Sequence, residues 1–280
     1  MKRNLTVVLL LLLVVALTTA CASTNAPAEG DGNAEAQELR VGMECGYPPF
    51  NWTQLDDSNG AVPIEGTQEF AGGYDVEIAK KVAEGLGRKL VIVKTDWDGL
   101  PPAVQSGKID AIMAGMSPTA ERAEMIDFSE PYYNSQLCVV VKADGPYANA
   151  KTLSDFSGAK IAAQLNTFHD TVVDQMTGAE HQVPLDNFST LRVALQSGSI
   201  DGYISEKPEA VSAMDALPGL AMIEPEPGFE TSPEDTAISV GIKKGSELTA
   251  SINEILKGIS DADRTTIMDA AIVNQPIHQD

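Results

Sequence analysis

The sequence contains one segment twice: Ala103-Val-Gln-Ser-Gly-Lys-Ile-Asp110 recurs as Ala194-Leu-Gln-Ser-Gly-Ser-Ile-Asp201. In each copy a helix end is followed by a glycine, which stops the helix, and then by the start of an apolar strand. The two glycines are Gly107 and Gly198. A helix-to-strand unit that occurs twice predicts two similarly built α/β halves.

Polar residues follow both strands. Ser117-Pro-Thr-Ala-Glu-Arg122 comes after the first strand, and Ser205-Glu206-Lys207-Pro208 comes after the second. In open α/β sheets the carboxyl ends of the strands face the ligand crevice. We therefore expect Arg122 and Glu206 to face each other across a cleft, which is an arrangement suited to a zwitterion.

The first residues predict export. Two basic residues precede an apolar run at 5–17, which is shorter than the roughly 20 residues of a membrane-spanning helix. The small residues before Cys21 resemble a bacterial lipobox, although Thr18 stands where a leucine is usual. We predict a lipoprotein signal peptide at 1–20 and a lipid on Cys21. A plain signal peptide is the alternative.

The segment 21–38 reads as a flexible tether, because it has no large apolar residue with which to bury a core. The globular part begins near Leu39. Its length of about 240 residues is enough for two lobes with sizeable cores. No later apolar stretch is long enough to cross a membrane.

The formal charge of the whole chain is -21, and removal of Lys2 and Arg3 with the signal peptide brings it to -23. So acidic a surface repels nucleic acid and anionic lipid and modestly favours cationic ligands, although solubility alone could explain it. Besides Cys21 the chain has Cys45 and Cys138. An exported protein can form a disulfide, but two unpaired, buried thiols fit the sequence equally well.

Strands and helices alternate in both halves, which predicts mostly parallel sheets. The expected strands are 39–43, 90–93, 109–113, 160–163 and 183–185. The expected helices are 74–86, 100–105, 167–176 and 189–196, and a capping box stands at 152–155.

Two short, β-branched runs, Leu137–Lys142 and Ala237–Ile242, are expected to cross between the halves. Two crossings make the second lobe an insertion in the first. The predicted division is 39–138 for the first part of lobe 1, 139–237 for lobe 2 and 238–280 for the rest of lobe 1. Lobes joined by two strands can close around a ligand.

Taken together, these residues resemble the extracytoplasmic solute-binding proteins of polar amino-acid ABC importers, the family of the histidine, glutamine and lysine/arginine/ornithine binding proteins. The resemblance covers residues 39 to 275. It is carried by Leu39-Arg-Val-Gly with Tyr47-Pro-Pro-Phe50, Gly73-Tyr-Asp-Val-Glu-Ile-Ala79, Trp97-Asp-Gly-Leu-Pro-Pro-Ala103, Gly107-Lys-Ile-Asp-Ala-Ile-Met113, Met116-Ser-Pro-Thr-Ala-Glu-Arg122 and Ile126-Asp-Phe-Ser-Glu-Pro-Tyr132. It implies an α/β fold of the periplasmic-binding-protein type II class, with two mostly parallel sheets joined by a two-strand hinge.

The resemblance assigns the carboxylate of the ligand to Arg122, whose planar fork of donors matches a carboxylate. Alone, this arginine could equally be a solvated surface residue. Across the cleft, Thr167, Phe168 and His169 open a helix whose free N–H groups favour an anion. The family usually has Gly-Thr-Thr-Gln or a similar run here, so the side-chain contacts of Phe168 and His169 depart from its pattern.

The ammonium group is assigned by the same resemblance to Glu206, where relatives carry an aspartate, with Ser117 Oγ and the Gly115 carbonyl as further acceptors. An exposed acid at a helix start is the alternative for Glu206. Because an unpaired charge in a closed cleft is costly, such an acid needs the ammonium as its partner.

The side chain of the ligand is expected between Tyr47 and Trp97, which could clasp an aliphatic stem or a cation. Trp97 could instead cap a hydrophobic core. Glu44 matches a place where relatives direct an acid at the distal group of the ligand. This acid favours lysine, arginine or ornithine, with glutamine or histidine as alternatives.

The predicted function is that of a lipid-anchored, extracytoplasmic receptor that delivers one L-amino acid to an ABC permease. We expect a monomer that binds no nucleic acid, metal or cofactor, at the surface of a Gram-positive cell or in a periplasm. A dehydratase or lyase on the same scaffold is the alternative. The catalytic alternative is weaker, because both anchors of an amino-acid clamp are expected and His169 is the one cleft candidate for a general base.

Overall fold

The computed structural model describes residues 37–276. The predicted signal peptide, the predicted lipidation site Cys21 and nearly all of the predicted tether lie outside these residues. Strand β1 begins at Glu38, which the prediction had placed at the end of the tether. Within the described part of the chain, no helix combines the length and the apolar character needed to cross a bilayer.

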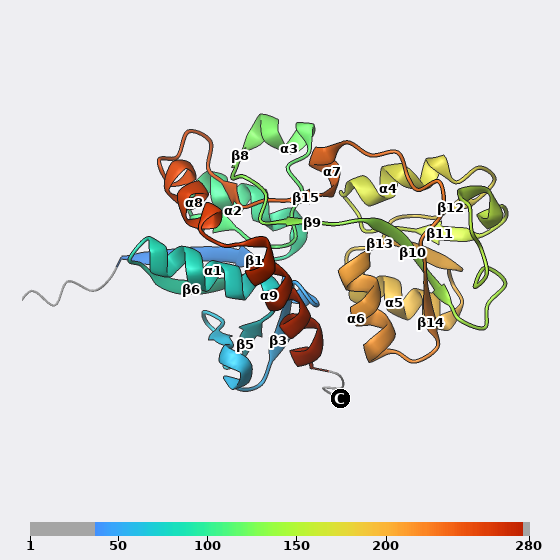
Figure 1. Ribbon diagram of the computed structural model, residues 1–280, viewed down its shortest axis with the longest axis horizontal. Coiled ribbons are helices and arrows are strands. Elements are labelled where there is room, and N and C mark those ends of the chain that lie inside the picture. The colour runs from blue at the N-terminus through green and yellow to red at the C-terminus, as the bar shows by residue number, and fades with distance from the viewer. Residues whose placement is uncertain (1–36, 277–280) are drawn as a thin grey trace, which may run out of the picture. The chain divides into compact units, whose positions relative to one another are not determined.

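Two five-stranded sheets form the centre of the fold (Figure 1). The first sheet has the order β6 (Lys89–Lys94), β1 (Glu38–Met43), β7 (Ala111–Ile112), β16 (Gly241–Ile242) and β8 (Asp127–Phe128). The second has the order β12 (Glu180–His181), β11 (Lys160–Ala162), β13 (Gly202–Glu206), β10 (Leu137–Lys142) and β14 (Leu220–Ile223). We call the parts of the chain around them the first and the second half.

The two sheets share one topology. In the first, β6, β1 and β7 pair in parallel, and β16 runs antiparallel to both β7 and β8. In the second, β12, β11 and β13 pair in parallel, and β10 runs antiparallel to both β13 and β14. Each sheet therefore has four strands in one direction and one reversed, which confirms the prediction of mostly parallel sheets.

The link between the halves differs in detail from the prediction. Strand β9 (Tyr133–Asn134) pairs with β15 (Ala237–Ile238), and this short ladder stands apart from both sheets. Strand β10 pairs along its length with β13 and β14 of the second sheet. The chain therefore crosses between the halves before β10 and not within Leu137–Lys142, where the crossing is predicted. The reversed strands β10 and β16 each follow directly from the ladder, which explains why they run against their neighbours.

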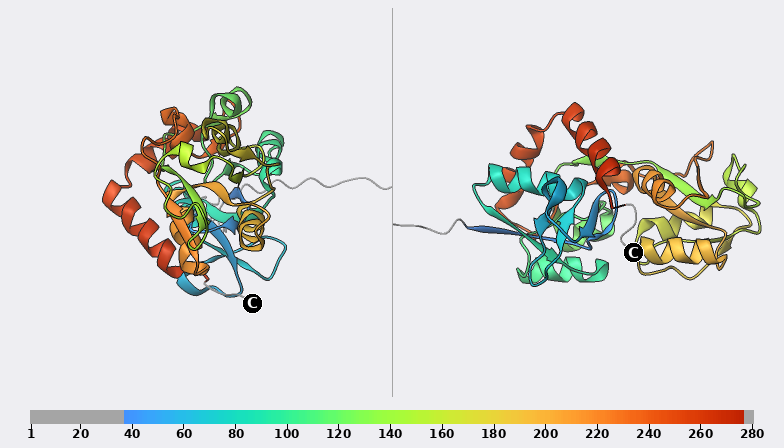
Figure 2. Two further views of the ribbon diagram at one scale, coloured as in Figure 1. Left: turned by 90° about the vertical axis from the view of Figure 1, so that its right-hand side faces the viewer. Right: turned by 90° about the horizontal axis from the view of Figure 1, so that it is seen from below.

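The helices cover the sheets as their apolar spacing requires. The first half contains α1 (Tyr74–Gly85), α2 (Leu100–Ser106), α3 (Ala120–Met125), α8 (Leu248–Lys257) and α9 (Asp261–Asn274), and the second contains α4 (Phe168–Val172), α5 (Phe188–Ser197), α6 (Lys207–Ala216) and α7 (Pro233–Thr236). Helices α8 and α9, drawn in red, pack against α1 (Figures 1 and 2). The C-terminal segment therefore rejoins the first half.

Shorter elements complete the described chain. A small sheet has the order β2 (Gly46–Tyr47), β3 (Asn51–Gln54), β5 (Phe70–Gly72) and β4 (Val62–Pro63). Single 3-10 turns are η1 (Ser58–Gly60), η2 (Trp97–Gly99), η3 (Leu153–Phe156) and η4 (Val173–Gln175). The predicted capping box is present at Thr152 and Asp155.

The strand predicted at 183–185 is wrong. Strand β12 lies earlier, at Glu180–His181, and Val183 is 81% exposed. Its pairing partner β11 is only three residues long, and Pro184 has no N–H group to extend the ladder. Only Leu185 regains a single bridge, to Gln164.

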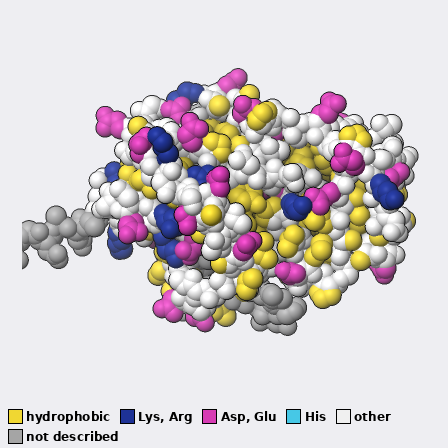
Figure 3. Space-filling model, in the orientation of Figure 1, with side chains coloured by type: hydrophobic (Ala, Val, Ile, Leu, Met, Phe, Trp, Pro, Cys, Tyr) yellow, Lys and Arg dark blue, Asp and Glu magenta, His cyan; other side chains and the backbone are white. Residues whose placement is uncertain are grey.

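Acidic side chains are spread over the face of the molecule shown in Figure 3 rather than gathered in one patch. Cys45 and Cys138 are both buried free thiols, one in each half, so the disulfide is excluded and the alternative of two unpaired thiols holds. Burial raises the pKa of Cys45 to about 12, which makes this thiol unreactive at neutral pH.

Candidate functional site

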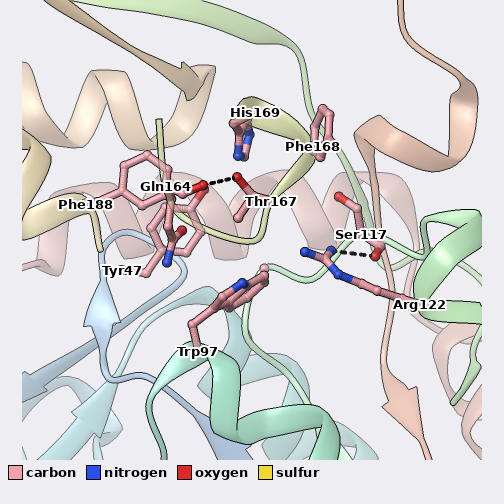
Figure 4. Close-up of a pocket in the computed structure, with 10 residues that line it drawn as sticks. Tyr47, Trp97, Ser117, Arg122, Gln164, Thr167, Phe168, His169 and Phe188 are labelled. Carbon is pink, nitrogen blue, oxygen red and sulfur yellow. Dashed lines mark hydrogen bonds between the residues drawn. The ribbon is translucent and has the colours of Figure 1, made fainter. Parts of the chain in front are cut away.

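A small cavity lies where the carboxyl ends of strands from both sheets meet (Figure 4). It is lined by Tyr47, Trp97, Gly115, Ser117, Arg122, Gln164, Thr167, Phe168, His169 and Phe188. Eight of the ten residues predicted from the sequence are among them. The other two, Glu44 and Glu206, lie directly behind this lining.

Arg122 is held firmly on the side of the first half. It lies in α3, whose N-terminus is capped by the Thr119 hydroxyl. Its Nη1 donates to the Ser117 carbonyl at 2.9 Å, and its guanidinium lies 4.9 Å from the ring centre of Trp97. Burial lowers the pKa of Arg122 to about 10, so the side chain remains cationic at neutral pH. Two of its five N–H groups are used, one of them by Asn166, and three remain for a ligand.

One face of the Trp97 indole ring is therefore not available to a cationic ligand. The guanidinium of Arg122 already occupies one side of its indole ring, and the indole Nε1 donates to the Asn166 carbonyl at 3.3 Å. Tyr47 stacks on Phe188 with ring centres 4.6 Å apart. Aromatic rings therefore line the cavity at Tyr47 with Phe188, at Trp97 and at Phe168 (Figure 4).

Glu206 ends strand β13 and is 1% exposed. One carboxyl oxygen accepts a hydrogen bond from the Tyr47 hydroxyl at 2.7 Å, which links the two halves. Burial raises the pKa of Glu206 to about 7 despite that hydrogen bond. A buried acid with so little compensation is a group that a cationic partner would stabilise.

His169 is the least satisfied polar side chain of the site. It is 6% exposed, and neither ring nitrogen has a hydrogen-bond partner within the described residues. Burial, with a smaller contribution from Arg122, lowers its pKa to about 3, so the ring is neutral. Its Nε2 lies 4.0 Å from Glu206, too far for a hydrogen bond. A neutral imidazole has one donor and one acceptor, and a molecule in the cavity could satisfy both.

Glu44 follows strand β1 and is reached from the second half. Gln164 donates to it at 3.4 Å and to the Asp186 carbonyl at 3.2 Å. Burial, together with the nearby charges of Asp96 and Asp98, raises the pKa of Glu44 to about 7. This corner of the site is therefore acidic.

The backbone at the cavity is shaped by special conformations. Gly115 has a φ of +62°, and a Cβ atom there would lie 2.7 Å from the Tyr47 ring. Thr167 caps α4 and donates from its hydroxyl to the Gln164 carbonyl at 2.7 Å (Figure 4). Helix α4 has only five residues before it tightens into η4. Its dipole is consequently weaker than the predicted helix at 167–176 would provide.

The sequence reading missed two residues of the lining, Gln164 and Phe188. The position of each residue in the sequence could have indicated its place in the site. Gln164 directly follows the predicted strand at 160–163, where ligand-facing residues are expected, and Phe188 stands one residue before the predicted helix at 189–196. Neither has a charge that would have drawn attention to it.

Comparison with known proteins shows the family of the chain. The family model of the bacterial extracellular solute-binding proteins, family 3, matches residues 39–269. A probable histidine-binding protein of Campylobacter jejuni is 33% identical over 76% of this chain and 80% of the relative. The arginine-binding extracellular protein ArtP of Bacillus subtilis is 27% identical over 87% of both chains.

A solved structure extends the likeness to the fold. It is an amino-acid ABC transporter substrate-binding protein of Streptococcus pneumoniae bound to L-arginine, with a TM-score of 0.74 and 28% identity over 84% of this chain and 94% of the other. The fold is thus of the periplasmic-binding-protein type II class, as the resemblance implied. The chain belongs to the bacterial extracellular solute-binding proteins of family 3.

Proposed function

We propose that this protein is the substrate-binding component of an ABC importer for a polar L-amino acid, and that the preferred ligand is basic: lysine, arginine or ornithine. The observation that carries the proposal is one cavity lined by a fixed cation and by an imidazole that has no partner among the described residues, with a buried acid directly behind the lining. Arg122 binds the α-carboxylate and Glu206 the α-ammonium. The zwitterion supplies His169 with the acceptor and the donor that it lacks.

The remaining predicted residues take supporting roles in this proposal. The Gly115 carbonyl and Ser117 accept from the ammonium, and Thr167 and Phe168 contribute to the carboxylate side through their backbone. Tyr47 and Trp97 flank the side chain of the ligand. We also propose the division of the chain into lobes 39–138, 139–237 and 238–280, which is supported by the two separate sheets and by the β9–β15 ladder that belongs to neither.

Two observations support a basic ligand. Glu44, Asp96 and Asp98 make the distal corner acidic, and relatives that bind arginine are similar over most of the chain. The ligand bridges the halves, so it binds the closed arrangement better than an open one and shifts the population toward it. The permease would then recognise the closed form.

We further propose that residues 1–20 are removed as a lipoprotein signal peptide and that Cys21 carries the lipid that holds this monomeric receptor outside the cell membrane. The motif before Cys21 supports this. Labelling of cells with a radioactive fatty acid should mark the protein and fail to mark a Cys21→Ala variant. Equal labelling of both would contradict the proposal.

The binding proposal is tested by a thermal-shift screen of the twenty amino acids with ornithine and citrulline, after unfolding and refolding to remove carried-over ligand. Ligand at about a hundred times its Kd stabilises the protein by about 2.7 kcal/mol. We expect the largest shift with a basic amino acid, and a Glu44→Gln variant should lose more affinity for arginine than for glutamine. Equal losses would contradict the role of Glu44, and no response to any amino acid would contradict the binding function and direct the search to turnover of carboxylic acids.

A further inference from the structure

Asn166 joins the two halves through three contacts, although asparagine is not a residue type that by itself indicates a functional role. It lies between β11 and α4 of the second half. Its carbonyl accepts from Trp97 Nε1 at 3.3 Å and from Arg122 Nη2 at 3.1 Å. Its side-chain Nδ2 donates to Asp98 Oδ1 at 2.9 Å. All three partners belong to the first half.

The backbone of Asn166 is adapted to this task. Its φ of +56° lies in the left-handed region, which asparagine tolerates better than most residues because its short side chain can form a local hydrogen bond. The left-handed turn directs the carbonyl at Arg122 and Trp97. The hydrogen bond to the charged Asp98 is stronger than a neutral one and opposes rotation of the residue.

The position of these contacts matters for access. The small inner cavity is adjoined by a larger, open one that shares Trp97, Arg122, Thr167 and Phe168 with it, while Asn166 and Asp98 line only the outer one. The Asn166–Asp98 hydrogen bond therefore lies on the outer side of the wall that separates the inner cavity from the open part of the cleft.

We propose that Asn166 is a positioning residue and latch of the candidate site. Its carbonyl holds the Arg122 guanidinium and the Trp97 indole in the orientation that faces the ligand, and its bond to Asp98 fastens the halves around the inner cavity. This inference rests on the proposed function for its effect on ligand affinity. Because all three contacts join protein atoms to protein atoms, the latch should also favour the closed arrangement in the ligand-free protein.

The test uses Asn166→Gly, which retains the carbonyl and accepts a positive φ but removes the bond to Asp98. The matched control is Asn59→Gly, since Asn59 also has a φ of +56° but lies in η1, outside the cavity lining. We expect Asn166→Gly to release the ligand about three- to tenfold faster, which is the range for loss of one ordinary hydrogen bond because solvent weakens this exposed one, whereas Asn59→Gly behaves as the unchanged protein.

A double-mutant cycle isolates the contact. Asp98→Ala removes the same hydrogen bond and also a charge near Glu44, so the double variant Asn166→Gly with Asp98→Ala should bind no worse than Asp98→Ala alone. Stopped-flow release of the amino acid identified in the screen measures the rate. Small-angle X-ray scattering of the ligand-free variants should show a larger radius of gyration for Asn166→Gly than for Asn59→Gly.

Unchanged release together with unchanged scattering, or additive effects in the cycle, would overturn the latch. Failure of the unmodified protein to bind any amino acid would overturn the proposed function instead, and the ligand-free scattering would then decide on the latch alone.

Discussion

The repeated segments Ala103–Asp110 and Ala194–Asp201 form the same hydrogen-bonded unit in the two halves. The Ala103 carbonyl accepts from the N–H groups two and three residues beyond the helix end at 2.9 and 3.3 Å, and the Ala194 carbonyl does so at 3.0 and 3.4 Å. Gly107 and Gly198 both have a φ of +77°. The two units are thus equivalent bond by bond.

The equivalence extends to the aspartate that closes each unit. Asp110 accepts from the Arg40 N–H at 2.8 Å, and Asp201 accepts from the Lys160 N–H at 2.9 Å. Each aspartate also donates its own N–H to the same partner residue at 2.8 Å. In both halves this pairing fixes the repeat against the neighbouring strand, β1 or β11.

Beyond the strands the halves diverge. The first half continues through Gly115 and Ser117 to Arg122, a cation held by backbone carbonyls. The second ends its strand at once in the buried acid Glu206, which is held by Tyr47 of the first half. One structural unit therefore builds both walls of the cleft, while the residues just past each strand decide the charge that each wall presents.

The largest effect is expected from removing the cation. Arg122→Ala deletes the donors proposed for the carboxylate, and a charge-assisted bidentate contact of this kind accounts for about a hundredfold in affinity or more. Isothermal titration calorimetry measures the loss, and the melting temperature without ligand checks that the fold is retained. Near-normal affinity in a folded variant would show that Arg122 does not bind the carboxylate and that the charge difference between the two halves has another role.

A smaller, pH-dependent effect is expected on the acidic wall. Because the pKa of Glu206 is raised to about 7, an ammonium group binds best above that pH, and the affinity should fall as the pH is lowered from 8 to 6. Glutamine is the appropriate ligand for this measurement, because the affinity of its uncharged side chain does not depend on the ionisation of Glu44. Glu206→Gln should weaken binding about tenfold at pH 8 and flatten the profile. A profile that stays steep in this variant would assign the titration to another group.

In the ligand-free protein, the contribution of Glu206 to folding stability changes with pH in the direction opposite to the ligand affinity. The raised pKa of Glu206 means that the folded protein holds a proton that the unfolded chain releases near its ordinary pKa of 4.5. The stability contribution is therefore fully present below pH 4.5 and is lost as the pH rises through about 7. Glu206→Gln should remove this part of the decline in denaturant unfolding.

The smallest effect tests the equivalence of the repeats themselves. Gly107→Ala and Gly198→Ala each force an alanine to a φ of +77°, which costs about 1 kcal/mol. A Cβ at Gly107 meets no atom within 4 Å, and one at Gly198 meets only the Lys142 ammonium at 3.6 Å. The two variants should therefore lose the same free energy of unfolding, measured in urea. Clearly unequal losses would show that the two repeats have different surroundings despite their matching hydrogen bonds.

Much of the fold could be predicted because it depends on local patterns. The apolar spacing from Tyr74 to Leu86 gave α1, the glycines gave the two helix ends, and the capping box at Thr152 gave η3. These signals act between residues a few positions apart. The strand predicted at 183–185 is wrong for two reasons: its pairing partner β11 ends early, which no local pattern reveals, and Pro184 lacks the N–H group for a ladder bond, which the sequence does show.

Local signals in the sequence, namely helix stops, apolar periodicity and strand ends, are enough to predict two α/β halves and the residues that follow their strands, because each signal depends on neighbouring residues. Which side chains bond to one another across the halves depends on the tertiary structure. Tyr47 on Glu206 and Asn166 on Arg122 join residues 159 and 44 positions apart. Such contacts depend on how the two sheets are set through the β9–β15 ladder. Burial between the sheets raises the pKa of Glu206 and leaves the His169 ring without a hydrogen-bond partner among residues 37–276.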